Sequence, residues 1–253
     1  MTISWKRIGV YLGIIGPIQF VIITAILMAI YPFPGYNFFL NSFSSLGLTV
    51  TNGVPTPHHN ILFAITCTFV AIASILFLLA LRPLFTKTTL LLIISWIGTI
   101  LGIASMPFLS ALSIFANDAF PSYHGIATQV FFLLIAIAIL IYSAAILLNS
   151  EYSNLYGLIG IIIGVLAFVY FVGLIAHVPI ISSAAMQKVA VYGLVLWSAF
   201  QGYYLLKLFP KDRIEPSVKC SRKKRDGVQE LHSPKLISDD RRAQTLYPVA
   251  HDQ

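Results

Sequence analysis

The stretch GIATQVFFLLIAIAILIYSAAILL, residues 125–148, decides the fold class of this chain. It carries no Asp, Glu, Lys or Arg along its whole length. A helix needs about 20 mainly apolar residues to cross the hydrocarbon core of a bilayer, and a charge at its centre costs roughly 2.5–3.5 kcal/mol on insertion scales. The stretch therefore predicts a transmembrane helix.

Five further apolar stretches flank this one, and nearly all the charge of the chain lies outside the six. The chain is 58% hydrophobic and only 10% charged, with a mean hydropathy of +0.86. Soluble globular proteins carry about 25% charged residues, so that class is excluded. We predict an all-α, polytopic membrane protein with six transmembrane helices. The predicted spans cover about residues 8–30, 61–81, 90–109, 125–148, 155–177 and 189–209.

The distribution of Lys and Arg predicts the orientation. Lys6 and Arg7 precede the first span, Arg82 and Lys87 lie between the second and third, and a basic segment follows the sixth. With six spans, all of these cations fall on one face, which the positive-inside rule assigns to the cytoplasm. We therefore expect both the N- and the C-terminus to be cytoplasmic, most simply in the cell membrane.

The chain divides into a six-helix transmembrane domain, residues 1–209, and a basic tail, residues 210–253, that we expect to be disordered. The formal charge is +7, but most Lys and Arg residues lie from Lys207 onward, beside a membrane domain. This placement predicts anionic lipid as the partner of the tail, and no nucleic acid. Alternatively, the basic cluster only sets the topology. The cluster consists of Lys219, Arg222, Lys223, Lys224 and Arg225.

A candidate site is expected at the opposite, outer face. The outer loop of about 30 residues after the first span is too long for a simple connector and is rich in hydroxyls, amides and aromatic rings. Four histidines and the outer charges Asp118 and Lys188 lie at the same depth as this loop. Folding the spans back and forth brings these groups together. The candidate ligand-binding residues are Tyr36, Asn41, Ser44, Asp118, His124, His177 and Lys188.

Several functions fit this set of residues. The groups could be structural, with the histidines and an Asp118–Lys188 pair satisfying loop and helix ends. They could bind a lipid headgroup or another small polar ligand without catalysis. A third hypothesis is a metal-dependent lipid hydrolase, because histidine nitrogens and a carboxylate can hold Zn²⁺ and leave a position for water. A transporter of an uncharged substrate is the fourth. The candidate metal ligands are His58, His59, His124, His177 and Asp118.

The order of several short motifs resembles a known family. Tyr31-Pro-Phe-Pro-Gly-Tyr is followed by Phe43-Ser-Ser-Leu-Gly, then by Phe115-Ala-Asn-Asp-Ala-Phe-Pro with His124-Gly, and by Met186-Gln-Lys with Leu196-Trp. In this order they resemble the six-helix membrane proteins catalogued as domain of unknown function 998, over about residues 5–210. The resemblance implies a fold and a topology but no activity. Ser45 stands where that family leads us to expect an acidic residue.

The inventory of serine, aspartate and histidine is also similar to that of alkaline ceramidase-like membrane hydrolases, with Ser44 or Ser45 as the polar partner. The spacing matches no compact metal motif, however, and a seventh helix is missing. We therefore expect a non-enzymatic role first and a hydrolase as the alternative.

Overall fold

The computed structural model describes residues 5–208. Its six α-helices are all long and apolar enough to cross a bilayer, which confirms the all-α, multi-pass class. Five of the helices begin within about four residues of the predicted starts of the spans, and α6 begins at Ala184, ahead of the predicted start at residue 189. The helices are α1 (Trp5–Ala29), α2 (Pro57–Leu81), α3 (Thr89–Ile114), α4 (Pro121–Leu148), α5 (Asn154–Ala176) and α6 (Ala184–Leu208).

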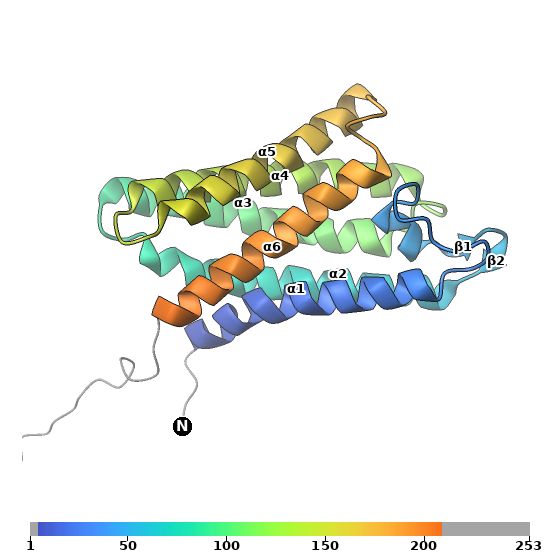
Figure 1. The fold of residues 1–253 in the computed structure, drawn as a ribbon, viewed down its shortest axis with the longest axis horizontal. Helices are drawn as coiled ribbons and strands as arrows, with labels where there is room; N and C mark the ends of the chain where they lie inside the picture. The colour runs from blue at the N-terminus through green and yellow to red at the C-terminus, as the bar shows by residue number, and fades with distance from the viewer. Residues whose placement is uncertain (1–4, 209–253) are drawn as a thin grey trace, which may run out of the picture. The chain divides into compact units, whose positions relative to one another are not determined.

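The helices form a closed ring in chain order. Each packs against the next along the chain, and α6 closes the ring against α1, crossing the other helices at an angle (Figure 1). The start of α1 and the end of α6 lie at one end of the bundle, which we call the termini end. The opposite end, with the long loop after α1, is called the loop end. The sequence prediction that the termini end is cytoplasmic stays a prediction.

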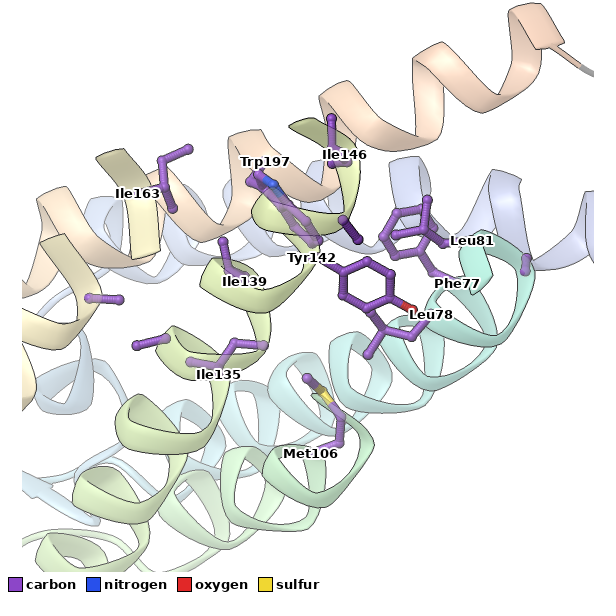
Figure 2. Close-up of a cluster of buried hydrophobic side chains, with 14 of the residues drawn as sticks. Phe77, Leu78, Leu81, Met106, Ile135, Ile139, Tyr142, Ile146, Ile163 and Trp197 are labelled. Atoms are coloured by element: carbon purple, nitrogen blue, oxygen red, sulfur yellow. The ribbon is translucent and has the colours of Figure 1, made fainter. Parts of the chain in front are cut away.

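Aromatic and aliphatic side chains fill the ring towards its termini end (Figure 2). The rings of Phe77 and Tyr142 both pack near the ring of Trp197. Their centroids lie 6.5 and 6.4 Å, respectively, from the Trp197 centroid. Glycines let the helices approach closely here. A Cβ atom at Gly13 would lie 2.3 Å from the Phe77 ring, and one at Gly160 would lie 2.2 Å from Ser143 Oγ. Small residues therefore pack helices of the same chain together.

The loop after α1 folds back onto the bundle. It contains a 3₁₀ helix, η1 (Phe43–Gly47), and an antiparallel hairpin of β1 (Val50–Thr51) and β2 (Val54–Pro55). Phe43 and Leu46 are buried among residues of α1 and α2. The hairpin turn consists of Asn52 and Gly53, both with positive φ, as two-residue hairpin turns of type I′ require. The loop thus covers the loop end of the bundle.

The structure departs from the predicted spans at the end of α3. The third helix continues through Pro107 to Ile114, beyond the predicted end at residue 109, because membrane helices tolerate an internal proline when neighbouring helices pack around it. A short 3₁₀ turn, η2 (Arg82–Leu84), follows α2. The basic cluster from Lys219 to Arg225, with its predicted anionic-lipid partner, lies outside the described residues.

Candidate functional site

A polar pocket opens at the loop end, between the start of α4, the end of α5, the start of α6 and the loop. Its volume is about 260 Å³. We call it the polar mouth. None of its lining residues is Asp, Glu, Lys or Arg. They are Ser42, Ser44, Asn117, His124, Gly125, Thr128, Gln129, Tyr170, Leu174 and Gln187.

A second, apolar cavity of about 120 Å³ lies inside the ring. We call it the apolar cavity, and its lining residues come from α1, η1, α2, α3, α4 and α6. Both His124 and Ile139 line it, and the four helical turns between them span about 22 Å. Its deep end reaches Trp197, in the cluster of Figure 2. Its aromatic lining residues are Phe20, Phe43, Phe63, Phe77, Phe131, Phe132 and Trp197.

The polar mouth and the apolar cavity share four lining residues, Ser44, His124, Thr128 and Gln187. A polar compartment at the loop end therefore adjoins an elongated apolar compartment within the membrane span. This arrangement matches the shape of an amphiphile, with a polar head at the end of the bundle and an apolar tail inside it.

His124 has a defined hydrogen-bonding state. It lies in the first turn of α4 and is 7% exposed. Its Nδ1 lies 3.0 Å from the carbonyl oxygen of Phe115. A carbonyl oxygen only accepts, so Nδ1 carries the proton, and in the neutral ring Nε2 is an acceptor. Thr128, one turn further along the same face, donates its hydroxyl proton to the His124 carbonyl oxygen.

Gln187 joins the loop to α6 beneath the mouth. Its Oε1 accepts a hydrogen bond of 2.7 Å from the backbone N–H of Phe43, and the residue is 7% exposed. The side-chain nitrogen keeps two N–H donors. Tyr170 also lines the mouth. At least one buried donor of Gln187 therefore stays available in the mouth.

Lys188 anchors the neighbouring part of the loop. It is 2% exposed, and its Nζ donates to the Asn41 carbonyl oxygen. The amine lies 5.3, 5.1 and 5.6 Å from the ring centroids of Tyr36, Phe38 and Phe43, within cation–π range. Lys188 lines neither the mouth nor the apolar cavity.

Tyr36 reinforces the same anchor. Its hydroxyl donates to the carbonyl oxygens of Asn41 and Ser42, at 2.9 and 3.0 Å. Burial raises the pKa of the Tyr36 hydroxyl above its usual range, so the group stays a neutral donor. Tyr36, Asn41 and Lys188 were predicted as ligand-binding residues, and the structure brings them together as a contact that holds the loop.

Asp118 holds the hairpin. Its carboxylate accepts hydrogen bonds from the backbone N–H groups of Thr49 and Val50 and from the Thr49 hydroxyl, at 2.7–3.2 Å. Partial burial acts to raise the pKa of this carboxyl, but the hydrogen bonds from Thr49 and Val50 outweigh it, and the pKa is lowered.

The predicted Asp118–Lys188 pair is wrong. Within residues 5–208 the ion pair is that of Lys87 with Glu151, at the termini end. Asp118 and Lys188 instead bind different parts of the loop. Asp118 accepts a hydrogen bond from the Thr49 N–H, whereas Lys188 donates one to the Asn41 carbonyl oxygen.

The other histidines lie apart from the mouth. His58 is exposed and His59 is buried in the first turn of α2, with 4.7 Å between their ring centroids. His177 is exposed, in the left-handed conformation that ends α5. The part of the chain that the structure describes contains no group of three His, Cys, Asp or Glu side chains placed to hold one metal ion. The zinc ligand set therefore stays a prediction without a supporting contact.

Sequence reasoning placed His124 and Ser44 in the site but missed Gln187 and Thr128. Thr128 follows His124 by four residues on one helix face, a spacing that could have indicated it. Gln187 gave no such signal, because its partner Phe43 lies 144 positions away.

No protein-family model, curated protein or solved structure matches this chain. The resemblance to domain of unknown function 998 therefore stays a prediction that rests on its short motifs.

Proposed function

We propose that this membrane protein binds an amphiphilic molecule, such as a lipid, without catalysing its conversion. The polar head would lie in the polar mouth and the apolar tail in the apolar cavity. The observation that carries the proposal is the continuity of the two compartments through Ser44, His124, Thr128 and Gln187. We further propose that the loop end faces away from the cytoplasm.

The energetics of the apolar cavity support occupation by an apolar tail. An empty cavity of about 120 Å³ would cost about 3 kcal/mol, at about 24 cal/mol per Å³. Water would recover little of this cost, because the aromatic and aliphatic walls provide few hydrogen-bonding partners. A hydrocarbon tail, in contrast, regains the missing dispersion contacts.

The covering loop supports binding at a preformed site. Phe43 and Ser44 line the apolar cavity, and the adjacent hydrogen bonds of Gln187 and Lys188 hold this segment against α6. The mouth therefore has a defined wall before a ligand arrives, which reduces the entropy lost on binding. A hydrolase is not favoured by any specific contact among the described residues.

Trp197 provides a direct test of the proposal. It lines the apolar cavity and is 4% exposed, whereas Trp5 and Trp96 are 54% and 43% exposed on the outside of the bundle. Replacing both exposed tryptophans by Phe leaves Trp197 as the fluorophore. We expect a chain-brominated single-chain amphiphile, added to the protein in nanodiscs of ordinary lipid, to quench Trp197 with saturation.

A matched pair of variants identifies the site of quenching. Val191 lines the apolar cavity, and Val189 on the same helix is 49% exposed. Val191→Phe fills the cavity and should remove most of the saturable quenching, whereas Val189→Phe should retain it. Equal quenching in both variants, or quenching that rises linearly with probe concentration, would contradict the proposal.

A further inference from the structure

We propose that the polar mouth selects a single-chain amphiphile with an uncharged hydroxyl head over one with a phosphate head. This inference rests on the proposed function and specifies its ligand. It follows from the charge of the mouth, from the unused hydrogen-bonding groups on its walls, and from the dimensions of the apolar cavity.

The mouth offers no countercharge for a phosphate. Its lining contains no Lys or Arg side chain. Lys188, which follows Gln187 in the sequence, directs its amine to the Asn41 carbonyl oxygen and to three aromatic rings. Burying an anion without a cation or a full set of donors is costly. A neutral head avoids this cost.

Two buried residues on the walls of the mouth present an acceptor and a donor whose roles are fixed by contacts within the protein. Nε2 of His124 is the acceptor, because the Phe115 carbonyl oxygen fixes the proton on Nδ1. Nε2 of Gln187 is the donor, because Oε1 is committed to the Phe43 N–H. Both residues are more than nine-tenths buried and line the mouth.

A hydroxyl group complements this pair. It donates its proton to His124 Nε2 and accepts from Gln187 Nε2, so both buried groups are satisfied by one head. An ether oxygen would accept from Gln187 but leave His124 Nε2 without a donor. Leaving a buried polar group unpaired is more costly than forming the bond is favourable.

The apolar cavity favours one chain. A volume of about 120 Å³ distributed over four turns of α4 makes a narrow space, which accommodates one hydrocarbon chain better than two. The depth of about 22 Å is most of the roughly 30 Å hydrocarbon core. The ligand would therefore lie nearly along the membrane normal, with its head at the loop end.

Three probes of identical brominated chain test the head preference through quenching of Trp197. They are a primary alcohol, its methyl ether and its phosphate monoester. The protein used has Trp5 and Trp96 replaced by Phe. It should bind the alcohol about 5- to 10-fold more tightly than the ether, as expected for one hydrogen bond to a buried group. The phosphate monoester should bind more weakly than the alcohol.

A variant separates His124 from general effects on folding. In His124→Asn, the side-chain amide can still donate to the Phe115 carbonyl oxygen, but the acceptor at the Nε2 position is lost. The difference between alcohol and ether should then disappear. The control is His58→Asn, an exposed histidine outside the mouth, which should retain the difference.

The outcomes distinguish this inference from the proposed function. If alcohol and ether bind equally to the chain with native His124, or if the phosphate binds at least as tightly, the head preference is overturned while amphiphile binding stands. If the difference persists in His124→Asn, the role of His124 is overturned. If no probe quenches Trp197 beyond the level of Val191→Phe, both proposals fall.

Discussion

The backbone N–H of Phe43 donates a hydrogen bond to Oε1 of Gln187, with 2.7 Å between nitrogen and oxygen. The contact joins the loop after α1 to the start of α6, and both residues line the apolar cavity. It therefore couples the position of the loop to the shape of the candidate site.

Gln187→Leu should destabilise the protein by about 1–3 kcal/mol, because it leaves the buried Phe43 N–H without an acceptor. Thermal unfolding in detergent measures the loss, and limited proteolysis of the loop locates it. Gln129→Leu is the control, since Gln129 also lines the mouth but makes no side-chain hydrogen bond within residues 5–208. Equal effects of the two substitutions would refute the structural role of Gln187.

The attachment of the hairpin should depend on pH through Asp118. Its folded pKa is lowered, so its contribution is present above the ordinary carboxyl pKa of about 3.9 and is lost as pH falls through the folded value. Hydrogen exchange of the Thr49 and Val50 amides should be slow near about pH 6 and comparatively less protected below about pH 3, after correction for intrinsic rates.

Asp118→Asn provides the control for this pH dependence. The variant should show weak protection at both pH values, because the neutral amide is a poorer acceptor and turns N–H donors towards the backbone N–H groups. Protection in the variant that still falls with pH would assign the effect to another group.

Gly160→Ala should destabilise the bundle by about 1–3 kcal/mol, because the new Cβ atom would lie 2.2 Å from Ser143 Oγ and 2.9 Å from Trp197 Nε1. Gly125→Ala is the matched helical control, with nothing within 4 Å of its new Cβ. It should be neutral or slightly stabilising, because alanine favours helix over glycine by up to about 1 kcal/mol. Thermal unfolding and Trp197 fluorescence together measure both variants, and a neutral Gly160→Ala would show that α4, α5 and α6 do not pack this closely.

Labelling in intact cells should test the orientation. Val54 is 49% exposed in β2 of the hairpin, so Val54→Cys presents an accessible thiol at the loop end. An impermeant thiol reagent should modify this cysteine but not Cys220, which the positive-inside rule predicts to be cytoplasmic. Cys67 is buried and serves as an internal negative control. If Cys220 reacts and the cysteine introduced by Val54→Cys does not, the predicted topology is reversed.

The sequence by itself determined the six membrane helices, because apolar length is a local property. Residues 125–148 predict a span whatever surrounds them, since the bilayer core excludes charge and unpaired backbone groups everywhere. The sequence also indicated His124 and Ser44 as members of the candidate site. The predicted third span ended at residue 109, whereas packing of neighbouring helices allows α3 to continue through Pro107 to Ile114.

Only the tertiary structure decided which polar groups meet. Asp118 and Lys188 have opposite charges and lie at the same end of the bundle, yet Asp118 accepts from Thr49 and Val50, and Lys188 donates to Asn41. The role of Gln187 likewise depends on a partner distant in the chain. Hydrogen bonds act over about 3 Å, so they depend on the register and rotation of packed helices, which local hydropathy does not encode.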